Sequence, residues 1–169
     1  SEIAKTLDNI RKRVVYQFQS YDAIEKLIKN QEAKLASIPA IQPVSNKQLN
    51  RIASGFGMRI HPIYGIAKMH PGLDFTAPQG TPIYATGDGI VTAAGSGTGT
   101  GNYVLINHGY GYETKYLHMV RIKATAGKPV KRGEVIGWVG STGASTGPHC
   151  HYEVHINGNP VDPVYFFFN

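Results

Sequence analysis

The residues with the clearest chemical potential are histidines and one aspartate in two short segments of this 169-residue chain. In the first segment, His70 and Asp74 are four residues apart, and the intervening Pro71 and Gly72 prevent a regular helix. The two side chains can therefore converge only where a loop runs into a strand. This spacing alone is a weak signal, because a structural histidine followed by a turn aspartate gives the same pattern.

The second segment, His149-Cys150-His151, is more informative. Alternate side chains of a strand share a face, so the two imidazoles point one way and Cys150 points the other. Cys150 is thus expected to be a small buried hydrophobe and not a ligand. Two neutral imidazoles and one carboxylate form a zinc set that leaves a fourth position open to water, as in hydrolytic zinc sites.

A long N-terminal helix is predicted upstream of these segments. Its apolar residues follow a four-three alternation, broken only by two glutamines, at Ile3, Leu7, Ile10, Val14, Tyr21, Ile24, Ile28, Leu35 and Ile38. This heptad seam predicts a coiled-coil-like helix over residues 1–38, about 55 Å long. Pro39 and Pro43 should end it, and residues 39–49 are expected to form a proline-containing linker. The seam is in register from Ile3, so we expect the native chain to continue upstream.

The periodicity of the sequence changes at Asn46 and from there predicts a β domain built from hairpins. We expect this domain to cover residues 50–169. Strand-like runs cover residues 82–86, 90–94, 103–107, 114–118, 135–139 and 149–156. Glycine-containing turns are predicted at residues 87–89, 109–111 and 157–159. The glycine-rich run 95–101 lacks the lysine and the βαβ context of a phosphate-binding loop, so we expect a mobile loop at the rim of a cleft.

Several motifs of the β domain resemble the lysostaphin-type (LytM-like) zinc metallopeptidases, and the resemblance spans Asn50 to Pro163. The matching groups are His70-x-x-x-Asp74, Tyr116-Leu117-His118-Met119 and the run from Ser145 to Val154, together with Phe56-Gly57-x-Arg59-x-His61-Pro62, Ala77-Pro78-x-Gly80-Thr81-Pro82 and Asn157-Gly158-x-x-Val161-Asp162-Pro163. The resemblance implies a mainly β fold, in which an antiparallel β-sheet sandwich or barrel-sandwich catalytic domain follows the helix. It also implies hydrolysis of peptide cross-links in bacterial peptidoglycan.

Carried over residue by residue, the resemblance implies that His70, Asp74 and His151 hold one Zn²⁺ per chain, and that His118 and His149 are catalytic. Zinc lowers the pKa of a bound water from near 16 to about 7 and polarises a peptide carbonyl. One histidine would accept a proton or orient the water, and the other would stabilise the oxyanion or protonate the leaving amine. The sequence does not say which histidine has which role.

The remaining histidines, His61, His108 and His155, are expected in loops or at a strand end, without a direct chemical role. Glu153 shares the strand face of His149 and His151, so we expect it beside the zinc ligands and not among them.

Composition limits the class of protein and its location. Hydrophobic residues make up 41% of the chain, charged residues 17%, and there are 20 glycines, which favours a turn-rich β fold. The net charge of +6 is spread along the chain, which argues against a nucleic-acid partner. Cys150 is the single cysteine, so no intramolecular disulfide can form. No membrane span is expected within the chain. The resemblance implies that the chain is located in the cell envelope, periplasmic or extracytoplasmic, where an upstream segment could anchor it to the membrane.

Three alternatives remain open at this point. A lipoyl or biotinyl carrier domain resembles residues 127–137, but the modified lysine at a hairpin tip is missing. A degenerate family member could regulate other wall hydrolases, although such proteins lack ligands that are complete here. Among substrates we favour a D,D-endopeptidase over a glycyl-glycine endopeptidase, because a helical spacer before one catalytic domain is similar to Gram-negative envelope members. The helix could be a spacer, a latch over the cleft or a self-association element.

Overall fold

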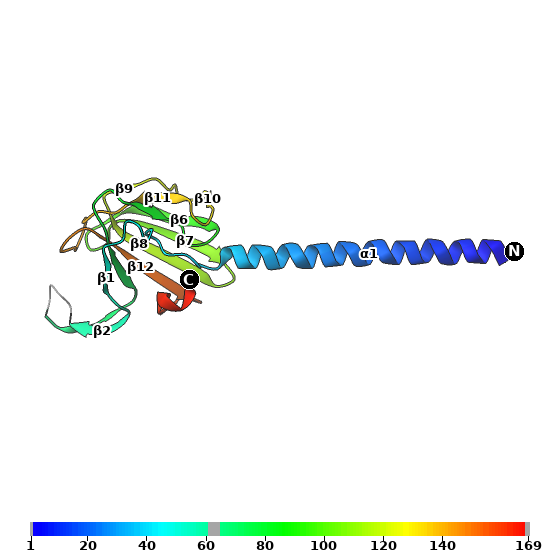
Figure 1. The fold of residues 1–169 in the computed structure, drawn as a ribbon, viewed down its shortest axis with the longest axis horizontal. Coiled ribbons are helices and arrows are strands. Elements are labelled where there is room, and N and C mark those ends of the chain that lie inside the picture. Colours follow the sequence, from blue (N-terminus) through cyan, green and yellow to red (C-terminus); the bar gives the residue numbers. More distant parts are fainter. Residues whose placement is uncertain (1, 61–64, 168–169) are drawn as a thin grey trace. The chain divides into compact units, whose positions relative to one another are not determined.

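The computed structural model describes residues 2–60 and 65–167 of the chain, and these form two compact units, residues 1–35 and residues 36–169 (Figure 1). His61 lies outside the described residues. None of the described helices is apolar and long enough to cross a membrane.

The described residues of the first unit all lie in one helix, α1 (Glu2–Ser37), whose last two residues belong to the second unit, and this confirms the long helix predicted from the heptad seam. Its eight seam residues from Ile3 to Leu35 are all exposed, with Ile10 at 52% and Ile24 at 51%. Ion pairs four residues apart link Asp8 to Lys12, Asp22 to Lys26 and Glu25 to Lys29 at 2.7–2.8 Å. Each such pair stabilises a helix by only a few tenths of a kcal/mol.

The second unit consists of antiparallel sheets, which confirms the mainly β fold. The largest sheet has the order β1-β4-β12-β8-β7-β6-β10, and β13 pairs with β12. Its strands are β1 (Arg51–Ser54), β4 (Leu73–Thr76), β6 (Gly89–Gly97), β7 (Gly101–Gly109), β8 (Tyr112–Met119), β10 (Pro129–Val130), β12 (His149–Ile156) and β13 (Asn159–Val161). A second sheet is formed by β5 (Pro82–Tyr84), β11 (Val135–Trp138) and β9 (Arg121–Ile122), and a third by β2 (Gly57–Ile60) and β3 (Ala67–His70). A 3-10 helix, η1 (Pro163–Phe166), follows β13.

The core is apolar and buries the side chains on one face of each long strand. Strand β12 buries Cys150, Tyr152 and Val154 in this core, and its histidines lie on the opposite face. Cys150 is fully buried, as predicted, and burial raises the pKa of its thiol. The other large members of the core are Leu73, Phe75, Ile83, Val91, Val104, Ile106, Tyr116, Met119, Ile136 and Val139.

A buried hydrogen-bond network crosses this core. The hydroxyl of Tyr116 accepts from the backbone amide of Thr86 at 3.0 Å and from the hydroxyl of Thr114 at 3.1 Å. His108 joins the network, because its Nε2 lies 2.7 Å from Thr114 and its Nδ1 donates to the carbonyl of Asp88 at 2.8 Å. Both ring nitrogens of His108 therefore form hydrogen bonds inside the β unit, and burial lowers the pKa of its imidazole.

The segment 39–49, expected as a linker, packs onto the β unit. Ala40 and Val44 are buried, and the backbone amide of Tyr84 donates to the carbonyl of Pro43 at 2.8 Å. The guanidinium of Arg132 donates to the carbonyl of Ile38 at 2.9 Å. The chain is therefore part of the β unit from Ala36 onward.

The glycine-rich run 95–101 is not one long loop, so that part of the prediction was wrong, although residues 97–100 do line the cleft described below. Gly95 to Gly97 extend β6 and Gly101 begins β7, so only residues 98–100 form the turn. Gly101 has a φ of +61°, and a side chain there would collide with Thr142. The hairpin tip is thus held close to the loop that carries Thr142.

Candidate metal centre and active site

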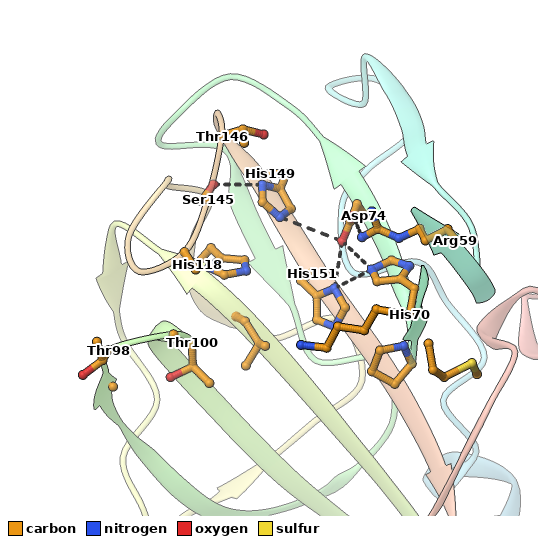
Figure 2. A pocket seen from close by; sticks show the side chains of 17 residues that line it. Arg59, His70, Asp74, Thr98, Thr100, His118, Ser145, Thr146, His149 and His151 are labelled. Atoms are coloured by element: carbon orange, nitrogen blue, oxygen red, sulfur yellow. Dashed lines mark hydrogen bonds and ion pairs between the residues drawn. The ribbon is translucent and has the colours of Figure 1, made fainter. Parts of the chain in front are cut away.

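Three of the sequence-predicted site residues converge from three different strands (Figure 2). His70 ends β3, Asp74 lies in β4 and His151 lies in β12, where it pairs directly opposite Asp74. Gly72 makes the approach of β4 to β12 feasible, because a Cβ at this position would collide with the carbonyl oxygen of Tyr152.

The distances among the donor atoms fit a small tetrahedral cation. The Nε2 of His70 lies 3.2 Å from the Oδ1 of Asp74 and 3.1 Å from the Nδ1 of His151, and this Nδ1 lies 2.8 Å from the same Oδ1. Ligands about 2.0–2.1 Å from zinc in a tetrahedron are separated from one another by about 3.3 Å. These three atoms therefore need to move only a few tenths of an ångström to bind zinc.

The hydrogen bonds of His70 and His151 also favour the tautomers that can bind a metal. The Nδ1 of His70 donates to the carbonyl of Gly55 at 2.7 Å, which leaves the lone pair of Nε2 facing Asp74. The Nε2 of His151 donates to the Oε1 of Glu153 at 3.0 Å, which leaves the lone pair of Nδ1 facing the same point. Such outer partners fix the orientation of metal-binding imidazoles. The donor set therefore fits Zn²⁺, with Glu153 outside it, as the strand pattern predicted.

The charges around this centre stabilise a cation. Burial alone would raise the pKa of Asp74, but hydrogen bonds from His151 and His70 outweigh it and hold this pKa far below its ordinary value. Burial likewise opposes the charged form of His151, yet hydrogen bonds with Asp74 and Glu153 raise its pKa to about 9. Two carboxylates thus favour positive charge at this point of the structure.

Glu153 connects the metal ligand His151 to two further side chains. Its Oε2 accepts from the Nε2 of His155 at 2.6 Å and pairs with the ammonium of Lys115 at 3.2 Å. Burial would raise the pKa of Glu153, but the hydrogen bonds from His151 and His155 prevail and lower it to about 2. His155 therefore supports Glu153 and does not face the cleft itself.

His118 and His149 face the same centre from the other side, and their rings lie 4.7 Å apart. The Nδ1 of His118 donates to the carbonyl of Thr142 at 2.8 Å, and the Nδ1 of His149 donates to the carbonyl of Gly147 at 2.8 Å. Both Nε2 atoms therefore remain available as proton acceptors, and that of His149 lies 3.8 Å from the Oδ1 of Asp74.

The backbone of His118 is held in a left-handed conformation, with a φ of +66°, which is uncommon for a residue other than glycine. Its amide donates to the carbonyl of Thr100 at 3.0 Å, and this bond fixes it to the β6–β7 hairpin. Burial, as the main cause, lowers the pKa of His118 to about 4, so the imidazole is neutral at physiological pH.

The five residues line one cleft of about 580 Å³. Sequence reasoning missed two positively charged residues of this cleft, Arg59 of β2 and Lys68 of β3. The guanidinium of Arg59 lies 3.4 Å from the Oδ2 of Asp74, the oxygen that does not face the histidines. Arg59 belongs to one of the matched motifs, but only the pairing of β2 with β3 reveals its place beside the metal ligands.

Fold and site together define the class of a zinc metallopeptidase. The model of Peptidase family M23 matches residues 68–163, which is more than half of the chain. The chain belongs to this family, and the lysostaphin-type resemblance is confirmed.

Two relatives in Neisseria and Vibrio are similar to this chain in sequence. The chain is 54% identical over 114 residues to the DD-carboxypeptidase/endopeptidase Mpg of Neisseria meningitidis, covering 68% of this chain and 26% of the relative. It is 46% identical over 123 residues to the peptidoglycan DD-endopeptidase ShyA of Vibrio cholerae, covering 72% of this chain and 28% of the relative. The chain thus spans about a quarter of the length of these relatives.

Solved structures agree with this placement. A zinc-containing peptidase from Vibrio cholerae superposes with a TM-score of 0.67 at 43% identity, over 72% of this chain and 37% of that one. The catalytic domain of lysostaphin from Staphylococcus simulans gives a TM-score of 0.64 at 34% identity, over 72% of this chain and 92% of that one.

Proposed function

We propose that this chain is the catalytic part of a zinc metalloendopeptidase that hydrolyses peptide cross-links of peptidoglycan, with D,D-endopeptidase specificity. The observation that carries the proposal is the convergence of three metal-binding lone pairs with two unprotonated Nε2 atoms across one cleft. The names of the relatives Mpg and ShyA support the D,D bond.

In this proposal His70, Asp74 and His151 hold one Zn²⁺, which supplies Lewis acidity for the attack of water on a peptide carbonyl. His118 and His149 move the protons. One Nε2 accepts a proton from the attacking water, and one histidine returns a proton to the leaving amine. The carbonyls of Thr142 and Gly147 keep both imidazoles in the tautomer that this exchange requires.

A glycyl-glycine endopeptidase is the second candidate, because the lysostaphin catalytic domain shares the fold at 34% identity. A regulatory binding module is disfavoured, since all five site residues are present and oriented toward one another. We further propose that the chain acts in the cell envelope, periplasmic or extracytoplasmic, which the names of the peptidoglycan-cleaving relatives support. The exposed seam of α1 is the candidate surface for self-association.

The test is digestion of purified Gram-negative wall, with the new peptide ends identified by mass spectrometry. We expect new D-alanine carboxyl ends and free diaminopimelate amines, abolished by a chelator and restored by added zinc. His118→Ala and His149→Ala should each reduce the rate by at least ~100-fold while keeping the metal, the scale of a lost proton-transfer group. Release of glycine ends from a glycine-bridged wall, with no action on the D,D link, would favour the second candidate.

A further inference from the structure

The imidazole of His118 owes its orientation to the loop between β11 and β12, residues 139–148. Its Nδ1 donates to the carbonyl of Thr142 at 2.8 Å, and its ring has no second hydrogen-bond partner within residues 2–60 and 65–167. The amide of Thr142 lies 3.4 Å from the carbonyl of His118, which is long for a hydrogen bond. The position of Thr142 therefore decides where the Nε2 of His118 points.

The side chain of Thr142 fixes that position through its hydroxyl group. The hydroxyl donates to the carbonyl of Met119 at 2.7 Å and accepts from the amide of Asn102 at 3.0 Å. Asn102 and Met119 are partners in the pairing of β7 with β8, and the side-chain amide of Asn102 donates to the same carbonyl at 3.0 Å. The hydroxyl of Thr142 thus bridges the two strands next to His118, and a shift of the loop would break both of its bonds.

Two glycines allow the loop to approach these strands closely. Gly101, at the start of β7, has a φ of +61°, and Gly143 has a φ of +72°. A Cβ on Gly101 would collide with the backbone of Thr142, and a Cβ on Gly143 would collide with the amide of Gly101. The amide of Ala144 donates to the carbonyl of Gly99 at 2.9 Å. The loop is therefore held against the tip of the β6–β7 hairpin on both sides of Thr142.

The backbone of His118 depends on this support. Its φ of +66° lies in the left-handed region, which residues other than glycine keep only where their surroundings fix it. The amide of His118 donates to the carbonyl of Thr100 at 3.0 Å, at the same hairpin tip. Strained residues of this kind concentrate at sites of chemistry. The bonds to Thr100 and Thr142 together hold the imidazole toward the metal centre (Figure 2).

We propose that the hydroxyl of Thr142 is a positioning group for His118 in proton transfer. This inference rests on the proposed function, in which His118 is one of two residues that move protons. Thr142 is not among the described residues that line the cleft, whereas His118 is, so the hydroxyl acts through the imidazole and not on the substrate. Its loss releases the Thr142 carbonyl from the β7–β8 pair, and the imidazole then rotates or takes up its other tautomer.

The first test replaces Thr142 with valine, which keeps the branched shape and lacks the hydroxyl. On a soluble D,D-cross-linked peptide dimer, Thr142→Val should lower kcat by about 10- to 100-fold, the scale of a misplaced catalytic group. KM should stay within about twofold and one zinc per chain should remain, because His118 is not a metal ligand in the proposed site. Thr142→Ser keeps the hydroxyl and should recover most of the wild-type kcat.

Nitrogen-15 NMR of the imidazoles gives a readout that does not depend on cleavage. In the zinc-loaded wild type at neutral pH, the Nδ1 of His118 should carry the proton, as its bond to the Thr142 carbonyl requires. Thr142→Val should give a mixture of the two tautomers of His118, and Thr142→Ser should match the wild type. His118→Ala assigns the signal.

Thr92→Val is the matched control. Thr92 is an exposed residue of β6, and its hydroxyl also donates to a backbone carbonyl, that of Leu105 at 3.3 Å. This variant should match the wild type in kcat, zinc content and the His118 signal. If Thr142→Val does not fold, Thr142→Ala takes its place, because alanine also lacks the hydroxyl and adds no methyl group.

Three results would overturn the positioning role and leave the proposed endopeptidase intact. They are a wild-type kcat in Thr142→Val, an equal loss of kcat in Thr142→Ser, and a His118 tautomer that Thr142→Val does not change. A loss of zinc in Thr142→Val would also overturn it, because the hydroxyl would then support the metal centre. A wild-type chain that cleaves no D,D-linked peptide would instead overturn the proposed function, and the NMR comparison would still test the hold of Thr142 on His118.

Discussion

The helix and the β unit use the same kinds of apolar residue in opposite ways. Ile83 and Ile136 of the β unit are fully buried, whereas Ile10 and Ile24 of α1 are about half exposed. Burying one such side chain stabilises a fold by about 1.5–3 kcal/mol, so the β unit contains its own source of stability. Along the described residues of α1, local ion pairs and helix propensity contribute to stability, and its exposed seam can contribute fully only against a partner.

Stability changes should be largest in the β unit. Ile83→Ala is expected to lower the free energy of unfolding by about 2–5 kcal/mol, because it leaves a cavity in a packed core. Ile24→Ala, the same change on the helix seam, should change the unfolding of the β unit by less than about 0.5 kcal/mol. Urea unfolding followed by the fluorescence of Trp138, the one tryptophan, measures both. Equal losses would show that the seam is a structural part of the β unit.

A smaller effect is expected where the chain enters the β unit. Burial would raise the pKa of Asp88, but hydrogen bonds from Lys131 and from the amide of Arg132 lower it below its ordinary 3.8. Asp88→Ala removes the side-chain acceptor of that Arg132 amide, at a cost of about 1 kcal/mol near pH 7.

The pH dependence of this loss follows from the downward shift of the pKa of Asp88. A lowered folded pKa adds stability above the unfolded pKa, and this stability disappears as pH falls through the folded pKa. The difference between wild type and Asp88→Ala should therefore be constant near neutrality and shrink below about pH 4. Asp8→Ala, which breaks an exposed ion pair of α1, is the control and should leave the unfolding of the β unit unchanged. A loss in Asp88→Ala that grew toward low pH would contradict this explanation.

The smallest effect on the β unit should come from removing residues 1–35. We expect the truncated chain to keep its zinc, its unfolding midpoint and its turnover on purified wall. If the seam pairs with a second copy, sedimentation should show a dimer for the full chain and a monomer after truncation. A several-fold rise in wall digestion would instead identify the helix as a latch and refute the spacer.

Much of this architecture could be predicted because its signals are periodic. The heptad seam located α1, and the alternation in His149 to Ile156 separated the histidines of β12 from its core residues. The β2–β3 hairpin was missed, because its strands are four residues long and mostly exposed, and so carry little hydrophobic pattern.

The orientation of the site histidines could not be predicted either. It depends on backbone carbonyls of Gly55, from the loop between β1 and β2, and of Thr142 and Gly147, from the loop between β11 and β12. A carbonyl is present at every residue, so no side-chain type marks the ones that the fold brings to an imidazole.

We propose that His70, Asp74 and His151 bind one zinc ion and that His149 takes part in the reaction without binding it. The most direct test of this proposal is the zinc content of purified wild-type chain, His151→Ala and His149→Ala after equilibration with zinc and desalting, with folding verified by circular dichroism. We predict one zinc per chain for the wild type and His149→Ala, and essentially none for His151→Ala. A folded wild-type chain that takes up no zinc, or a His149→Ala that loses zinc while His151→Ala retains it, would contradict the account.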